Sequence, residues 1–395
     1  MILWGTYPPD PRVRREAEFL ADKGHTVDLY CANDGSQPST EHIGGVDIYR
    51  IQAKNSNPIR QASFHLGLVD PIWGATIRKI TAAKNYDIIH VHDLPPVRTV
   101  RLFNQCSTAR IVCDFHELYP ESLATQKRVM SRYQRVLRPH WRYKKYERKA
   151  IKNCGGLITE SNVARYHFET SYDLKTTPVT AIRNVPDIEH LNAELGHDDS
   201  PADEGDNDDK FRITYVGNFT HQRDLVTLLE AFAVVNERRP ETELYLVGAG
   251  EITQQLRRTA VFLGIERDVT FTGWVDFEQV LKYLTTTDVG ICTWKDTDRD
   301  AKCTLPNKLF QYMYCGVPSI TSDLPAMAEV VRSETSGVLV TPEHEEELAS
   351  AIHQLIDEPS KQNELAANAR RAVHERYNFA NEGMHLVRLY EQVLK

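Results

Sequence analysis

The sequence contains no pair of cysteines at CxxC spacing, and its seven cysteines stand singly along a chain of 395 residues. That spacing argues against a zinc-finger type of site and against a disulfide framework, and it is typical of a reducing compartment. No apolar run approaches the ~18 residues that a membrane-spanning helix needs. No leader-like segment stands before the first strand-like run, "MILW". We therefore expect a cytoplasmic protein that meets a membrane only peripherally, on its inner face.

Two phosphate-binding signatures are missing as well. Neither GxxxxGK[ST] nor GxGxxG occurs, and "GAG" at 248–250 is too short to count as either. An excess of positive charge is also lacking, because the formal net charge is -8, so the chain as a whole does not attract nucleic acid. What remains is a composition ordinary for a globular protein, with a length that favours two domains.

Strand-like and helix-like patterns alternate along the chain. "MILW" precedes a segment with apolar residues at helical spacing, "PRVRREAEFLADKG", and "TVDLYCA", "YDIIHVHD" and "ARIVCDFHE" are typical of further strands. A second series begins at "FRITYVG" and runs to "SGVLVT". Repeated βα units of this kind predict parallel sheets covered by helices, with ligands at the carboxyl ends of the strands.

The alternation breaks once, between 187 and 209, where the chain is acidic and poor in large apolar residues. We expect an exposed segment without fixed structure there. The predicted fold class is therefore α/β, with two Rossmann-like parallel-sheet domains facing a cleft. We place the N-terminal domain at 1–185, the acidic linker at 186–210 and the C-terminal domain at 211–375. The last segment, 376–395, has an amphipathic helix pattern that needs another surface to cover its apolar face.

Three expected helix starts carry a cation, where the helix dipole is positive. Asp10 is a candidate N-cap that Arg12 follows, Arg223 stands at the entry of a later helix, and Lys308 lies in the first turn of another. An anion between each cation and the free backbone amides would satisfy both. The structural alternative is that such cations point into solvent or pair with neighbours such as Glu16. Three coincidences at strand-to-helix turns favour a ligand that carries phosphate.

Three histidines stand at the ends of expected strands. His90 and His92 lie on one face of "HVHDLP", and His116 lies in "DFHELYPE". A histidine in such a place is more often structural than catalytic. The functional reading is better for His116, because the carboxylate of Asp114 or Glu117 beside it would fix its tautomer.

Together these residues resemble a GT-B glycosyltransferase of the retaining family 4 type (glycosyl transferases group 1). The resemblance covers nearly the whole chain and is carried by "YPPDPRVRREAEFLADKGH", "IIHVHDLP", "DFHELYPE", "IRNVPD", "YVGNFTHQRDLVTLLEAF", "VTFTGWV" and "LPNKLFQYMYCGVPSITSDLPAMAEVV". It implies twin Rossmann-like domains, with the acceptor on 1–185, the nucleotide-sugar on 211–375 and the helix at 376–395 crossing back to the N-terminal domain.

Residue by residue, the resemblance is uneven. The phosphate-binding arginine and lysine of the family fall on Asn218 and Arg223, so one cation is lost. Its paired glutamates fall on Cys303 and Gln311, and its catalytic-site histidine falls on His116. Where the family has an N-terminal Gly-Gly turn, this chain has "PPDPRVR" instead. The resemblance implies that Arg12 of this segment would supply an anion contact. The residues assigned to the donor are Gly217, Asn218, Arg223, Thr304, Asn307, Lys308 and Gln311.

The stretch 126–153 holds many lysines and arginines and a single acid. Tyr133, Trp141, Tyr143 and Tyr146 are interleaved with them, a pattern typical of a membrane headgroup boundary. A solvated helix face and a nucleic-acid partner are the alternatives. With the family resemblance, we favour an anionic membrane surface and no nucleic acid.

We therefore expect a retaining glycosyltransferase that moves a sugar from a UDP- or GDP-sugar to a lipid-linked or growing glycan acceptor. "DTDRD" at 296–300 contains a DxD triplet, which can hold a diphosphate through a metal. Such triplets also occur by chance in this acidic chain, so we expect no metal and no cofactor. The alternatives are a sugar-nucleotide epimerase of the same fold and a non-catalytic scaffold, which the two lost glutamates favour.

Overall fold

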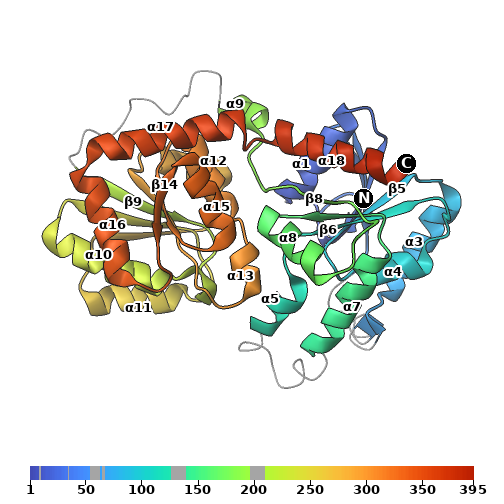
Figure 1. The fold of residues 1–395 in the computed structure, drawn as a ribbon, viewed down its shortest axis with the longest axis horizontal. Coiled ribbons are helices and arrows are strands. Elements are labelled where there is room, and N and C mark those ends of the chain that lie inside the picture. The colour runs from blue at the N-terminus through green and yellow to red at the C-terminus, as the bar shows by residue number, and fades with distance from the viewer. Residues whose placement is uncertain (9, 34, 54–62, 65–66, 126–138, 196–209) are drawn as a thin grey trace. The chain divides into compact units, whose positions relative to one another are not determined.

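The computed structural model describes residues 1–395 except 9, 34, 54–62, 65–66, 126–138 and 196–209. The chain divides into two compact units. The first unit comprises 1–183, 298–303 and 380–395, and the second comprises 184–297 and 304–379. Each is an α/β unit built on its own sheet (Figure 1).

The sheet of the first unit has eight strands in the order β3-β4-β2-β1-β5-β6-β7-β8. All its neighbours pair in parallel except β3 and β4, which form an antiparallel pair. The strands are β1 (Ile2–Thr6), β2 (Val27–Ala32), β3 (Thr40–Ile43), β4 (Val46–Ile51), β5 (Ile88–His92), β6 (Arg110–Phe115), β7 (Gly156–Thr159) and β8 (Val179–Ala181).

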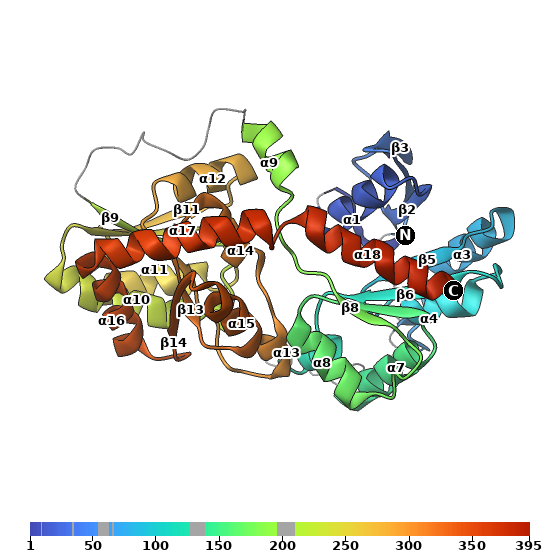
Figure 2. The ribbon, with the colours of Figure 1, turned by 45° about the horizontal axis from the view of Figure 1, so that its top comes forward.

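Helices cover both faces of this sheet. In Figures 1 and 2, α1 and α18 lie over one face, and α4, α7 and α8 lie over the other. The helices are α1 (Pro11–Asp22), α3 (Pro71–Ala83), α4 (Val97–Phe103), α5 (Tyr119–Thr125), α7 (His140–Lys152), α8 (Asn162–Ser171), α13 (Arg299–Cys303) and α18 (Phe379–Leu394).

The start of α1 follows the local sequence signals. The Asp10 side chain accepts hydrogen bonds from the amides of Arg12 and Val13, and Pro11 occupies the first helical position. The helix then buries Val13, Ala17 and Leu20 at helical spacing, as the sequence predicts.

The second unit has a six-stranded, fully parallel sheet in the order β11-β10-β9-β12-β13-β14. Its strands are β9 (Phe211–Val216), β10 (Thr242–Val247), β11 (Val269–Gly273), β12 (Val289–Cys292), β13 (Ser319–Ser322) and β14 (Gly337–Val340). Its helices are α9 (Ile188–Leu195), α10 (Leu225–Arg238), α11 (Thr253–Leu263), α12 (Phe277–Thr285), α14 (Asn307–Cys315), α15 (Pro325–Glu334), α16 (Glu345–Asp357) and α17 (Pro359–Glu375). In Figures 1 and 2, α10 and α11 lie over one face and α12 over the other.

The predicted α/β class with two parallel-sheet domains is confirmed. Two segments differ from the prediction. Residues 298–303 group with the first unit, because the Leu118 amide donates to Asp300 and the Ser161 hydroxyl donates to the Cys303 carbonyl. The start of the expected linker forms α9, and its part at 196–209 lies outside the described residues. Among the described helices, none has the length and apolar character needed to cross a bilayer.

Candidate functional site

In the second unit, the chain reverses its direction along the sheet between β9 and β12. Parallel α/β sheets bind ligands at the carboxyl ends of the strands beside such a reversal. At this one, β9 ends at Val216 and is followed by Gly217, and β12 ends at Cys292, two residues before Trp294. The residues that follow these two strands are therefore the first place to look for a ligand site.

Backbone lines the end of β9. Gly217 has a φ of 127°, and a Cβ on it would lie 3.4 Å from Nζ of Lys308. Gly248, at the end of β10, has a φ of 137°, and a Cβ there would lie 2.1 Å from the Gly217 carbonyl oxygen. Both backbone conformations and the close approach of the two turns require glycine. Gly217 thus places no side chain against Nζ of Lys308.

Lys308 is the second residue of α14, and its side chain is buried under the end of β9. Nζ lies 3.4 Å from the centroid of the Tyr215 ring and has no hydrogen-bond or ion-pair partner among the described residues. Burial lowers the pKa of Lys308 well below its ordinary value, and the nearby Arg223 guanidinium lowers it further. A buried amine without a partner is costly, and an incoming anion would satisfy it.

Arg223 supplies a second cation near Lys308. Its Cζ lies 3.2 Å from the centroid of the Trp294 ring, so the guanidinium stacks on the side chain that follows β12. Arg223 ends a 3-10 turn, His221–Arg223, and α10 begins only at Leu225. The expectation that Arg223 lies at the entry of the helix is therefore corrected by two residues. The left-handed backbone of Asp224, with a φ of 56°, separates the turn from the helix.

The other donor residues proposed from the sequence lie in the same unit as Lys308. Asn218 follows Gly217 and is exposed, whereas Asn307 and Gln311 lie on α14 with Lys308. Thr304 is half-buried in the loop before α14. The structure thus brings Gly217, Arg223 and Lys308 together. The assignment of Asn218, Thr304, Asn307 and Gln311 to the donor stays a prediction.

Cys303, the other position of a lost glutamate, belongs to the first unit. It ends α13, is buried and packs in the apolar core of that unit. Burial raises the pKa of its thiol to about 12, so the side chain is neutral near pH 7.

In the first unit, Asp114 at the end of β6 is the centre of a buried charged network. Arg12 donates to its carboxylate through Nε (3.0 Å) and Nη2 (2.7 Å). The same guanidinium lies 3.1 Å from Glu16 and donates through Nη1 to the Ile182 carbonyl. The anion contact expected of Arg12 is therefore wrong. The protein's own carboxylates hold this side chain, which is 4% exposed.

His116 lies at the more exposed edge of this network. Its Nε2 is 2.7 Å from Asp114 Oδ2, and its Nδ1 is 3.6 Å from Asp93 Oδ1. Burial lowers the pKa of His116, but Asp114 and then Asp93 outweigh burial and raise the pKa to about 10. The imidazole is thus doubly protonated near pH 7 and donates hydrogen bonds rather than accepting a proton. His90 and His92 are fully buried behind it, as the structural interpretation predicts.

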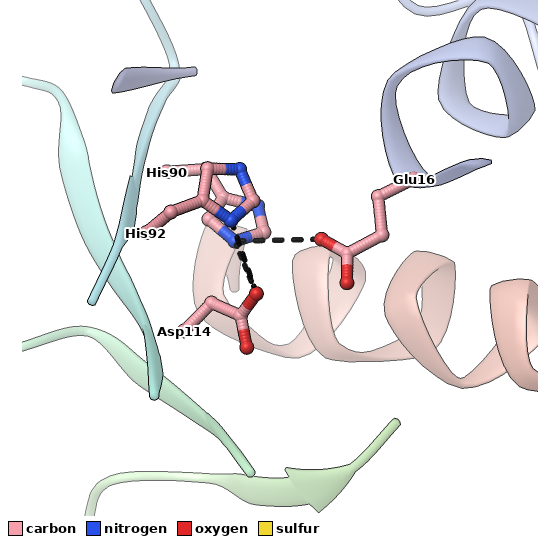
Figure 3. Close-up of side chains that lie close together, drawn as sticks. All are labelled: Glu16, His90, His92 and Asp114. Carbon is pink, nitrogen blue, oxygen red and sulfur yellow. Dashed lines mark hydrogen bonds and ion pairs between the residues drawn. The ribbon is translucent and has the colours of Figure 1, made fainter. Parts of the chain in front are cut away.

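Four residues of this network are arranged like metal ligands. Glu16, His90, His92 and Asp114 each offer one ligand atom, and these atoms lie within 4.8 Å of one another (Figure 3). Nitrogen and carboxylate oxygen sets of this kind suit Zn²⁺. Here the Arg12 guanidinium contacts both carboxylates and the doubly protonated His116 contacts Asp114, so two cations already face the two carboxylates. We therefore interpret the cluster as a charge-compensated anchor for α1, β5 and β6.

Carboxylates from three other segments lie beside His116. Burial raises the pKa of Glu117 to about 7, and Asp300 raises it further. Burial and Asp300 also raise the pKa of Glu160 well above its ordinary value. The sequence indicated Glu117 beside His116 and Asp300 within "DTDRD", but not Glu160, and nothing in it indicated that the three lie close together, because they are far apart along the chain. Asp298 and Asp300 of the "DTDRD" segment each accept a backbone amide, from Ala301 and Leu118.

Two protein-family models match the chain. The model described as Glycosyltransferase Family 4 matches residues 12–190, and the model described as Glycosyl transferases group 1 matches residues 197–372. Among curated relatives, a phosphatidyl-myo-inositol mannosyltransferase from Mycolicibacterium smegmatis is 24% identical, over 95% of this chain and 88% of that protein. A chitobiosyldiphosphodolichol beta-mannosyltransferase from Yarrowia lipolytica is 22% identical, over 86% of this chain and 75% of that protein.

Solved structures share the fold at low sequence identity. A sucrose-phosphate synthase from Thermosynechococcus elongatus gives a TM-score of 0.74 at 21% identity and covers 99% of this chain and 98% of its own. The Anabaena protein HepE in complex with UDP-glucose gives a TM-score of 0.70 at 16% identity, with the same coverage. At these identities the likeness shows the fold alone.

Proposed function

The chain belongs to the GT-B glycosyltransferases of the family 4 type, and on that premise we propose that it is a retaining, metal-independent enzyme. Its donor would be a UDP- or GDP-sugar, and its acceptor a lipid-linked or growing glycan. The names of two relatives, which refer to phosphatidyl-myo-inositol and to a diphosphodolichol, support a lipid-linked acceptor. The HepE complex with UDP-glucose supports a nucleotide-sugar donor.

One observation carries the donor assignment: the buried Lys308 amine, which has no hydrogen-bond partner among the residues that the structure describes, lies beside Gly217 and Arg223. During transfer, negative charge develops on the departing diphosphate. Two cations held in a site of low polarity stabilise that charge, and the backbone amides at the start of α14 add to them. Lys308 and Arg223 would thus stabilise the charge that a bound metal ion would otherwise stabilise.

In the proposed reaction, the bond from the sugar C1 to the diphosphate oxygen breaks, and a bond from C1 to the acceptor oxygen forms on the same face. The acceptor proton passes to the leaving phosphate oxygen. His116 is doubly protonated near pH 7 and so is not a general base. We assign it the role of a hydrogen-bond donor that orients the sugar.

For the acceptor, α4 and α7 offer a basic surface that we call the α4–α7 patch. Every exposed charged residue on these two helices is a lysine or arginine. Arg101 on α4 donates to the Lys149 carbonyl on α7, so the helices lie side by side. Trp141 and Leu102 are 68% and 57% exposed. The exposed members are Arg98, Arg101, Leu102, Trp141, Lys145, Arg148, Lys149 and Lys152.

Cations around exposed apolar side chains suit an anionic membrane surface, and we propose that the α4–α7 patch docks there, on the inner face of the cell membrane. Tyr143 and Tyr146 do not take part, contrary to the expectation from the sequence, because both lie on the buried face of α7. Tyr133 lies outside the described residues.

Vesicle flotation tests the docking proposal. Lys145→Glu with Lys149→Glu should abolish flotation with vesicles containing phosphatidylglycerol. Arg258→Glu with Lys282→Glu on the second unit, an equal change of net charge, should leave it intact. Equal flotation with neutral vesicles, or equal loss in both double variants, would remove the proposal.

Turnover with nucleotide-sugars tests the proposed reaction. UDP- and GDP-sugars are incubated in EDTA with membrane lipid extract, and released nucleotide and the product anomeric signal are followed by NMR. The proposal expects release that depends on the extract and an anomer that matches the donor. Interconversion of free nucleotide-sugars without release would instead identify an epimerase. Binding without either reaction would favour the scaffold, which Gln311 and Cys303 in place of glutamates otherwise suggest.

A further inference from the structure

The first unit contains a cavity of about 250 Å³ between β8, α8 and α18. Three arginines and a histidine line it: Arg165, Arg183, Arg388 and His385. None of its lining residues belongs to the Asp114 network or to the surroundings of Lys308. The cavity is smaller than the roughly 300–1,000 Å³ of pockets that enclose drug-sized ligands, so it suits one small chemical group.

The floor of this cavity is a free strand edge. β8 is the last strand of its sheet. The Leu157 amide donates to the Pro178 carbonyl, and the Ile182 amide donates to the Thr159 carbonyl. Pro178 and Ile182 therefore direct backbone groups toward β7. Because successive residues of a strand direct their N–H and C=O groups to opposite sides, the backbone groups of Val179 and Ala181 point away from β7, toward the cavity that these residues line. Arg183 is the next alternate residue after Val179 and Ala181. Its amide donates to Glu382 of α18, so the amides on this side of the strand point away from β7.

The charges around the cavity are only partly balanced. Arg183 is bound to Glu382 at 2.6 Å, and this carboxylate is 1% exposed. Arg165 is 3.9 Å from Glu169, a long contact between exposed groups. Arg388 has no ion-pair or hydrogen-bond partner in the part of the chain that the structure describes. Neither carboxylate lines the cavity, so the charged side chains that line it include three arginines, while the carbonyls of Val179 and Ala181 point the same way as their amides.

We propose that this cavity binds a phosphate group. Guanidinium groups donate two parallel hydrogen bonds to phosphate oxygens, and the amides of Val179 and Ala181 supply further donors on the floor. Arg165 and Arg388 come from helices that face each other across β8, so one phosphate can be held from both sides. The phosphate belongs either to a small phosphorylated molecule or to the diphosphate of a lipid-linked acceptor. The second source rests on the proposed function, whereas the first does not.

Calorimetric titration tests the site in the Lys308→Met background, in which the proposed donor site no longer competes for phosphate. The probes are inorganic phosphate, inorganic diphosphate, a hexose 6-phosphate and an undecaprenyl diphosphate in detergent, in 0.15 M NaCl. We expect saturable binding of at least one probe, weakened about tenfold or more by Arg388→Gln or Arg165→Gln. Arg78→Gln, an exposed arginine of α3 in the same unit, serves as the matched control and should change nothing.

The pattern of probes separates the two sources. A preference for hexose 6-phosphate identifies a small phosphorylated molecule, and a preference for the lipid diphosphate identifies the acceptor. The proposal is overturned if no probe binds below 10 mM, or if Arg78→Gln weakens binding as much as Arg388→Gln. Because these titrations use protein without Lys308, their failure leaves the donor assignment untouched, and failure of the donor assignment leaves this cavity untouched.

Discussion

Lys308→Met should have two opposite effects, because this lysine is costly to the free protein and useful to the liganded one. Burial lowers the pKa of Lys308 well below 10.5 in the folded protein, whereas the unfolded chain keeps an ordinary lysine. At any pH between these two values the unfolded state binds more protons, so Lys308 destabilises the fold there. Methionine is unbranched, apolar and of similar length, and it can pack on the Tyr215 ring without that cost.

The size of the effect follows from the linkage. Each unit by which the pKa is lowered, down to the pH of the measurement, makes the free protein less stable by about 1.4 kcal/mol. The contact between Nζ and the Tyr215 ring, at 3.4 Å, offsets part of this by a cation–π term of up to about 2 kcal/mol. Each kcal/mol of net gain should raise Tm by about 2–4 °C for a unit of this size. The gain is full below the folded pKa and vanishes as the pH rises through 10.5.

Thermal unfolding from pH 7 to 10, followed for wild type, Lys308→Met and Lys282→Met, measures this difference. Lys282 lies exposed on α12 and serves as the matched control. We expect a higher Tm for Lys308→Met at pH 7 and a difference that shrinks toward pH 10. A variant that is less stable than wild type at pH 7, or a difference independent of pH, would refute the reasoning.

The same linkage predicts that a nucleotide-sugar takes up a proton when it binds above the lowered pKa of Lys308, because its diphosphate restores the charged form of this lysine. Affinity should then fall by up to tenfold per pH unit, and calorimetry in buffers of different ionisation enthalpy would report the proton uptake. Asp93→Asn keeps a residue that tolerates the left-handed backbone at φ 64° and should lower the pKa of His116 from about 10, measured by NMR titration; an unchanged value would show that Asp114 acts alone. Arg12→Met leaves Asp114 and Glu16 buried without their cation and should lower the free energy of unfolding by about 3–5 kcal/mol in urea, whereas a loss below 1 kcal/mol would contradict the anchor. Gly217→Ala should weaken nucleotide binding, because φ is 127° and the new Cβ meets Nζ of Lys308; wild-type affinity would speak against the site.

Much of the fold could be predicted from the sequence, because local signals and burial agree in it. Apolar runs such as "FRITYVG" and "VGICTW" are short and buried on both sides, which is the pattern of parallel strands. Asp10 and Pro11 at the start of α1, and Gly316 with a φ of 67° after α14, are helix signals that act within one turn. These signals are local, so the elements can be located before it is known which distant segments they pack against.

The parts that the sequence did not predict depend on distant contacts. Nothing local indicates that 298–303 joins the first unit, since its partners Leu118 and Ser161 lie far away along the chain. Arg12 and Lys308 present the same local signal, a cation in the first turn of a helix. Arg12 contacts two buried carboxylates, whereas Lys308 contacts none within the described part of the chain, and only the folded chain distinguishes them.

A thermal shift panel tests whether the second unit holds a nucleotide-sugar through Lys308. UDP, GDP, ADP and their sugar conjugates are each added, with and without EDTA, to wild type, Lys308→Met and Lys282→Met. We expect stabilisation by one nucleotide class, about 2.7 kcal/mol at 100 times its Kd, unaffected by EDTA, kept in Lys282→Met and lost in Lys308→Met. No shift with any nucleotide, or an equal shift in Lys308→Met, would contradict it.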